Sequence, residues 1–114
     1  MVQRFDVGPR LSEMSVHNGV CYLAGQVPED GSQDIAGQTT QVLAAIDALL
    51  ARAGSSKRKL LRVEIFLKDL ADFSGMNTVW EAWLPPGDAP PRATVQAHLA
   101  RPEWRVEMVV TAAL

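Results

Sequence analysis

Short stretches of alternating or helically spaced apolar residues run along the whole chain, and their spacing predicts six strands and two helices. Asn18-Gly19 separates two of the alternating stretches. This dipeptide is typical of a type I′ hairpin turn, because both central positions of that turn need a positive φ. The predicted strands cover residues 3–7, 12–17, 20–26, 60–69, 90–99 and 104–110, and the predicted helices cover residues 34–53 and 71–83.

The ends of both helices carry recognisable signals. Ser32 or Asp34 can cap the free N–H groups of the first helix, and Gly54 stands where a helix commonly ends. The first helix carries one apolar stripe at helical spacing, which indicates a core helix rather than a cofactor-binding segment. Asp69 or Asp72 can cap the second helix, and Pro85-Pro86 stops it.

The resulting order, β-β-β-α-β-α-β-β, predicts an α+β fold of two layers, a mixed sheet with both helices on one face. In the strand over residues 60–69, Leu61, Val63, Ile65 and Leu67 are expected to share the core face. In the strand over residues 90–99, the side that carries Ala93 and Val95 is apolar and is expected to pack on the core. Arg92 and Thr94 lie on the other side, which is polar. The second sheet face carries too many apolar groups to remain exposed to solvent, which predicts oligomerisation through that face.

The length, charge and cysteine count of the chain exclude several classes of protein. The chain has 114 residues, a length typical of one domain, and a net charge of -2, which argues against a nucleic-acid-binding module. Cys21 is the only cysteine, so an intrachain disulfide is impossible and a cysteine metal site is not expected. The N-terminus has no apolar signal segment, and no apolar run approaches the roughly 20 residues that span a bilayer. These features predict a soluble cytoplasmic protein.

Arg92 and Glu107 are the candidate chemical groups. A guanidinium can hold a carboxylate by two parallel hydrogen bonds, and a positioned carboxylate can move protons. Arg92 opens one predicted strand and Glu107 lies on the next, so the two side chains could face a small ligand together. The alternative is an exposed or ion-paired arginine and a glutamate that pairs with Arg105 or Lys68.

Four ordered stretches carry a resemblance to a known family. They are Leu23-Ala24-Gly25-Gln26-Val27-Pro28, the Phe-Leu-Lys-Asp-Leu-Ala-Asp-Phe run that ends at Phe73 with Asn77 after it, Pro90-Pro91-Arg92-Ala93-Thr94-Val95, and Val106-Glu107-Met108. From about Gly19 to Leu114 the chain resembles the Rid family (RidA/YjgF, the reactive-intermediate imine deaminases, formerly labelled L-PSP endoribonucleases). The resemblance covers nearly the whole chain, and it implies a single Rid-like domain over residues 1–114.

The resemblance implies a chorismate-mutase-like fold, a homotrimer with ligand sites between subunits, and an activity like that of 2-iminobutanoate/2-iminopropanoate deaminase. It implies that Arg92 binds the carboxylate of a 2-imino or enamino acid and that Glu107 orients the attacking water. Gly25, Asn77 and Thr94 would line the site.

Two positions depart from the family pattern. Ala24 stands where well-studied members have a serine, and Leu11 stands where they have a pocket tyrosine, so the pocket is expected to be more apolar. Neither departure removes Arg92.

Three rival functions stay open. The first is a non-catalytic module of the same fold that binds a small carboxylate, the second is an endoribonuclease or translation inhibitor, and the third is a purely structural role. The acidic balance and the missing basic groove speak against an RNA substrate. No cofactor, metal ion, nucleic acid or membrane partner is expected.

Overall fold

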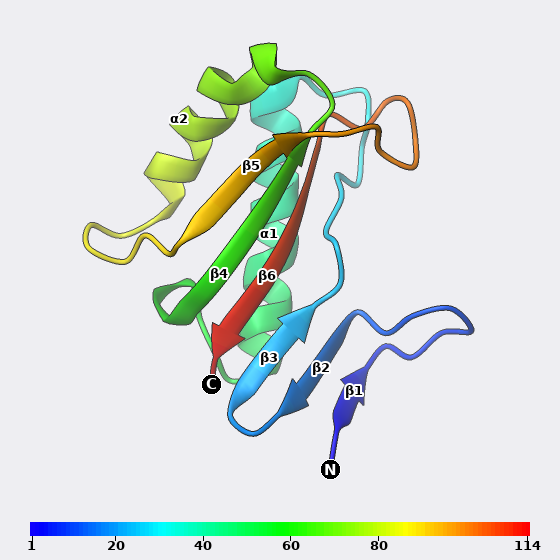
Figure 1. The fold of residues 1–114 in the computed structure, drawn as a ribbon, viewed down its shortest axis with the longest axis vertical. Coiled ribbons are helices and arrows are strands. Elements are labelled where there is room, and N and C mark those ends of the chain that lie inside the picture. The colour runs from blue at the N-terminus through cyan, green and yellow to red at the C-terminus, as the bar shows by residue number, and fades with distance from the viewer.

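A computed structural model describes all residues from Met1 to Leu114. Figure 1 shows one six-stranded sheet in the order β1-β2-β3-β6-β4-β5, in which β4 and β5 run parallel and the other neighbours run antiparallel. The strands are β1 (Gln3–Phe5), β2 (Met14–His17), β3 (Val20–Leu23), β4 (Leu60–Leu67), β5 (Arg92–Gln96) and β6 (Val106–Ala113), and the α-helices are α1 (Ile35–Arg52) and α2 (Phe73–Trp83).

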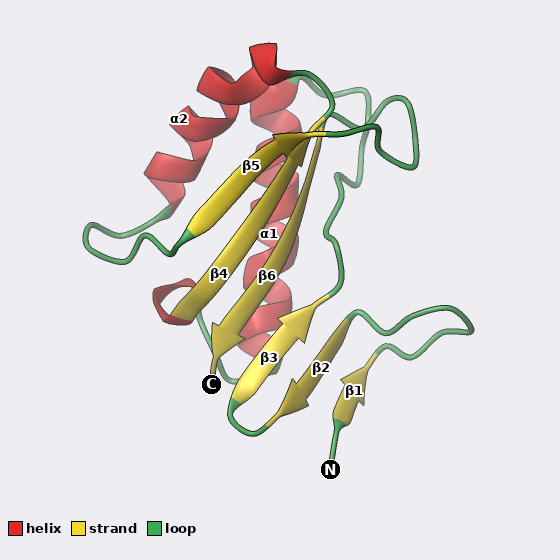
Figure 2. Ribbon diagram, viewed as in Figure 1, coloured by secondary structure: helices red, strands yellow, loops and turns green.

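Both helices lie on one face of this sheet, as Figure 2 shows most plainly for α1, which runs behind the strands. Buried apolar side chains fill the space between the helices and that face. The predicted α+β class, the order of elements and the two-layer arrangement are therefore confirmed. Neither helix combines the length and apolar composition of a membrane-spanning helix.

The N-terminal hairpin forms where its turn signal predicts. Asn18 has a φ of 50° and Gly19 a φ of 78°, so both central residues of the turn have the positive φ that a type I′ turn requires. Strands β2 and β3 pair across this turn, with His17 opposite Val20. The hairpin then joins the rest of the sheet where β3 pairs with β6.

Asp34, one of the two predicted caps, begins α1. Its side chain accepts a hydrogen bond from the backbone N–H of Gly37 at 2.9 Å. The Ser32 hydroxyl instead donates to the Asp30 carboxylate at 2.7 Å. At the other end Gly54 has a φ of 80°, a backbone conformation that glycine adopts without steric cost.

Strand β4 departs from the predicted pattern at its first residues. The pairing with β6 shifts register between Leu60 and Arg62, so Leu60 turns into the core and Leu61 is 46 % exposed. The expectation that Leu61 shares the core face is therefore wrong, whereas Val63, Ile65 and Leu67 are buried as predicted. One extra residue at a bulge reverses the side of the residues before it.

Helix α2 begins two residues later than predicted, after a single 3₁₀ turn over Leu70–Asp72. Asp69 caps this turn by accepting a hydrogen bond from the N–H of Ala71 at 2.9 Å, whereas the Asp72 side chain makes no capping bond. The helix ends at Trp83, just before Pro85-Pro86, as predicted.

Strand β5 presents the opposite side to the one predicted. It lies parallel to β4 with Arg92 beside Val63 and Thr94 beside Ile65, and these two neighbours face the core. Arg92 and Thr94 therefore point toward the helices, and the apolar side of the strand points away from them, with Val95 47 % exposed. The expectation that the apolar side packs on the core is wrong.

The sheet face opposite the helices has no covering layer within the chain (Figure 2). The strand registers place Tyr22, Phe66, Val95 and Val109 on this face, and Arg62 and Glu64 form an ion pair there at 3.5 Å. We call it the open face. Its mixture of aromatic and aliphatic side chains agrees with the expectation that another copy of the chain covers it, which stays a prediction.

The Asp34 cap gives a test of the fold. Asp34→Ala removes an acceptor for a free N–H group of α1 and is expected to lower the free energy of unfolding by about 1 kcal/mol. Ser32→Ala, which removes the other predicted cap, is expected to change it by less than about 0.5 kcal/mol. Chemical denaturation of both variants checks this, and an equal effect of the two would contradict the assignment of the cap.

Candidate functional site

Arg92 lies at the start of β5, where its side chain meets the inner face of α2. Its Nη2 donates a hydrogen bond to Oδ1 of Asn77 at 2.6 Å. The guanidinium carbon lies 5.2 Å from the ring centroid of Trp80 and 5.9 Å from that of Phe73. One amide and two aromatic rings of a single helix thus hold this cation in place.

No carboxylate neutralises Arg92 within 4 Å, although the side chain is half-buried. Burial lowers the pKa of the guanidinium from its usual value, and the negative charge of Glu81 opposes that shift. An arginine still stays protonated at physiological pH. No ion pair within the chain therefore holds this arginine, and N–H donors remain that could bind an anionic group.

Thr94 lies two residues beyond Arg92 on the same side of β5. Its hydroxyl oxygen is buried and has no hydrogen-bond partner. A buried polar group without a partner costs free energy unless something else satisfies it. The neighbourhood of Arg92 thus includes a second polar group that is unsatisfied within the chain.

Glu107 lies on β6 and packs directly against Gly25, in the segment that follows β3. A Cβ atom at Gly25 would overlap Oε2 of the flexible Glu107 side chain, so the carboxylate lies directly over the backbone of Gly25. Glu107 makes no ion pair with the predicted alternative partners. Arg105 pairs with Asp72 at 3.3 Å, and Lys68 donates to the carbonyl of Pro102.

Within one chain Arg92 and Glu107 lie on opposite faces of the sheet. Glu107 pairs with Phe66, whose side chain is on the open face, whereas Arg92 pairs with Val63 on the helix face. The expectation that these two side chains face one ligand together does not hold within a single chain. Each chain instead carries two half-sites: Arg92, Asn77 and Thr94 form one, and Gly25 and Glu107 form the other.

The two positions that depart from the family pattern belong to the N-terminal half of the sheet. Ala24 precedes Gly25, and its N–H donates to the carbonyl of Glu13 at 2.9 Å. Leu11 is 55 % exposed in the loop between β1 and β2, which projects from the sheet in Figure 1.

The aromatic partners of Arg92 were missed as site residues. The signal was present, because Phe73, Asn77 and Trp80 recur at intervals of four and three residues, which places them on one side of α2. Trp80 is 5 % exposed, so its side chain also belongs to the core.

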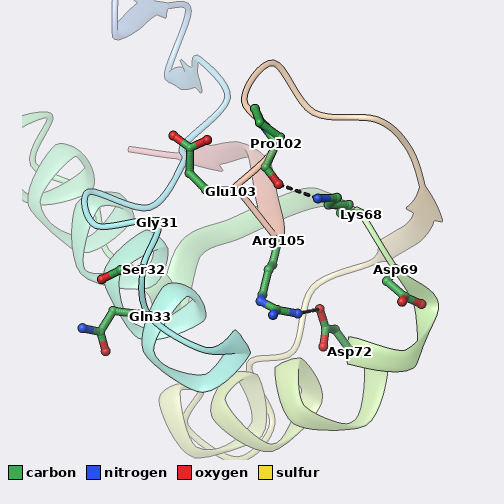
Figure 3. Close-up of a pocket in the computed structure, with 9 residues that line it drawn as sticks. All are labelled: Gly31, Ser32, Gln33, Lys68, Asp69, Asp72, Pro102, Glu103 and Arg105. Carbon is green, nitrogen blue, oxygen red and sulfur yellow. Dashed lines mark hydrogen bonds and ion pairs between the residues drawn. The ribbon is translucent and has the colours of Figure 1, made fainter.

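A polar hollow of about 340 Å³ lies elsewhere, between the loop before α1, the turn after β4 and the loop before β6 (Figure 3). Its charged groups largely satisfy one another, since Arg105 pairs with Asp72 and Lys68 bonds to Pro102. None of the predicted site residues lines it; the lining consists of Gly31, Ser32, Gln33, Lys68, Asp69, Asp72, Pro102, Glu103 and Arg105. No group of three or more His, Cys, Asp or Glu side chains in the structure could hold a metal ion.

Known proteins resemble this chain over its full length. The sequence profile described as endoribonuclease L-PSP matches residues 1–114. A RutC family protein of Haemophilus ducreyi is 46 % identical over 114 residues, which is 100 % of this chain and 97 % of the relative. A protein of Acinetobacter baylyi named 3-aminoacrylate deaminase RutC is 32 % identical over 101 residues, covering 83 % of this chain and 79 % of that protein.

The fold has a solved counterpart at similar identity. The crystal structure of a member of the YjgF protein family from Neisseria meningitidis superposes with a TM-score of 0.96 at 48 % identity, covering 99 % of this chain and 94 % of that one. The chain therefore belongs to the Rid (YjgF) family of proteins.

Proposed function

We propose that the protein hydrolyses reactive 2-imino or enamino acids to 2-oxo acids and ammonia, at sites formed between copies of the chain. The observation that carries this proposal is the Arg92 guanidinium, which is half-buried, oriented by Asn77 and not neutralised by any carboxylate of its own chain. The relative named as a 3-aminoacrylate deaminase supports the same reaction class.

Arg92 would bind the substrate carboxylate. Its planar fork suits two parallel hydrogen bonds, and bonds of this charge-assisted kind contribute about 1.5–3 kcal/mol each. Asn77 occupies one N–H of the fork and leaves others free. The Thr94 hydroxyl, which has no partner within the chain, lies on the same side of the strand and would line this part of the site.

Glu107 would serve as the proton-transfer group. Water adds to the carbon of the C=N bond as the Glu107 carboxylate accepts one of its protons. The carboxylic acid then gives that proton to the nitrogen, which forms a carbinolamine. The carboxylate next moves the hydroxyl proton of the carbinolamine to the nitrogen, the C–N bond breaks as the C=O bond forms, and ammonia and the 2-oxo acid are released. An enamino acid first takes a proton on carbon to become the imine. Positioned acid–base groups typically increase the rates of such reactions by a factor of about 10²–10⁴.

A second copy of the chain would bring the two half-sites together. The open face carries apolar side chains that no other part of the chain covers. Contacts between subunits commonly bury apolar surface of this kind. In a homotrimer each copy would give its Arg92 half-site to one neighbour and its Glu107 half-site to the other. Leu11 and Ala24 would add apolar wall at this contact, which favours imino acids with apolar side chains.

The reaction is tested by a competition assay. An amino-acid oxidase generates imino acids in place, semicarbazide traps them, and a hydrolase lowers the yield of semicarbazone. The wild-type protein is expected to lower that yield, and Arg92→Ala is expected to lose about 10²–10⁴-fold in kcat/KM, because two charge-assisted bonds are removed. The variant should keep the oligomeric state and thermal stability of the wild type.

Arg58→Ala is the matched control, since Arg58 is an exposed arginine that pairs with Asp88 and is not one of the proposed site residues. Full activity of Arg92→Ala would contradict the mechanism. An unchanged semicarbazone yield with the wild type across a panel of amino acids would contradict hydrolysis and favour a carboxylate-binding protein of the same fold.

Variants of Asn77 test whether Arg92 binds the substrate or has only a structural role. Asn77→Asp would place a carboxylate on the guanidinium, where it competes with the substrate, so KM is expected to rise about 10-fold or more with stability unchanged or increased. Asn77→Ala, which only removes the hydrogen bond, should raise KM less. Thr78→Ala is the control on the neighbouring position, and a wild-type KM for Asn77→Asp would show that Arg92 does not bind the substrate.

A further inference from the structure

Gln38 is a completely buried glutamine in the first turn of α1, and its amide joins three separate segments. Its Nε2 donates to the carbonyls of Gly31 and Gln33 at 3.1 Å each and to that of Glu103 at 3.0 Å. Its Oε1 accepts a hydrogen bond from the backbone N–H of Arg105 at 2.7 Å. One side chain thus binds the loop before α1 to the loop before β6.

The hydrogen-bonding groups around the end of the Gln38 side chain fit an amide and do not fit a carboxylate. Three carbonyl oxygens surround the Nε2 side, so the group there must donate, and the Arg105 N–H faces the other side, so the group there must accept. The two loops also approach closely, because a Cβ at Gly31 would overlap the side chain of Glu103. Figure 3 shows the two loops that carry Gly31 and Glu103 side by side.

These two loops are direct continuations of the segments that carry Gly25 and Glu107. The N–H and carbonyl of Gln26 pair with the carbonyl and N–H of Met108 at 2.8 and 3.0 Å, one residue beyond the contact between Gly25 and Glu107. Gln38 holds the same two segments together a second time, at Gly31 and at Arg105. Along the chain Glu107 therefore lies between two tied residues, Arg105 and Met108, and Gly25 directly precedes the tied residue Gln26.

We infer that Gln38 is a positioning residue for Glu107, whose buried amide fixes the loop before β6 against the loop before α1 and so sets where the Glu107 carboxylate lies. This inference rests on the proposed function for its consequence in catalysis. Gln38 itself faces the helix side of the sheet and does not touch the proposed substrate. Its effect reaches the reaction through the backbone of residues 105–107.

The expected signature is a loss of kcat without a matching rise in KM. Gln38→Met keeps the length of the side chain and removes all four hydrogen bonds. A displacement of about 1 Å at a catalytic group can cost about 10²-fold, so kcat should fall by about 10–100-fold. KM should stay within about 2-fold, because Arg92 and Asn77 are held by α2 and not by these loops.

Gln41→Met is the matched control, because Gln41 is on the same helix and bonds to the same loop by one exposed contact, the N–H of Asp30 at 2.9 Å. It should leave kcat and KM at wild-type values. A Gln38→Met protein that folds and keeps the wild-type kcat would overturn the inference, as would a kcat loss equal to that of Gln41→Met.

Gln38→Glu provides a second variant with a pH signature. Three carbonyl oxygens and complete burial disfavour the ionised form of the introduced carboxyl, so its pKa in the folded state is raised above the unfolded value near 4.3. Below a pH of about 4.3 the introduced carboxyl is mostly neutral in both the folded and the unfolded state, so its ionisation does not destabilise the fold. As pH rises above this value, the folding equilibrium constant should fall by up to about tenfold per pH unit until the folded pKa is reached.

Denaturant unfolding at pH 5 and pH 7 measures this loss, and kcat should fall over the same interval. Gln41→Glu and the wild type should not show it. A Gln38→Glu protein with the pH profile of Gln41→Glu would contradict the arrangement of the buried amide. This variant also keeps the inference testable at pH 5 if Gln38→Met does not fold.

A readout without substrate separates this inference from the proposed function. In amide NMR spectra of the intact oligomer, Gln38→Met should shift the signals of Gly25 and Glu107. The indole N–H of Trp83, which bonds to Asp47 at 2.9 Å between the helices, should stay in place. Unshifted Gly25 and Glu107 signals would overturn the positioning role, whereas shifted signals in a protein without hydrolase activity would overturn only the reaction.

Discussion

A single sheet with helices on one face divides the chemistry of this protein into two parts. Side chains alternate between the faces of a strand, so each functional group belongs either to the helix side or to the open side. Arg92 lies on the helix side beside α2, and Glu107 lies on the open side against Gly25. No movement of a side chain carries either group through the sheet. Any reaction that uses both groups on one small molecule therefore requires more than one copy of the chain.

The surroundings of each half-site explain why it is ready to act. Aromatic rings and one amide hold the Arg92 cation, and no carboxylate of the chain lies within 4 Å of it, so in the proposed reaction its charge would be available for the substrate. Glu107 lies directly over the backbone of Gly25, and two ties between its segment and the segment after β3 hold the backbone around it. Preorganised groups of this kind do not need to rearrange during a reaction.

Local signals predicted the fold well because they act over a few residues. Asn18-Gly19 adopts the turn that its dipeptide favours, and Asp34 caps the helix that follows it. The errors lie where a neighbouring strand decides the outcome. Leu61 is exposed because of a bulge in the pairing of β4 with β6, and the side that β5 turns to the core is set by its register with β4. Periodicity within β5 describes two faces without saying which is inside. The residues of the candidate site were named from the sequence, but their division between two faces needs the pairing of the sheet.

A complementation experiment tests the central claim most directly. Arg92→Ala and Glu107→Gln are each expected to be inactive alone, and the two chains are co-expressed with different tags so that mixed oligomers can be purified. Purified mixed trimers should recover about one third of the wild-type activity, because one of the three contacts in each of them joins an intact Arg92 to an intact Glu107. No activity in verified mixed oligomers would contradict a site shared between copies of the chain.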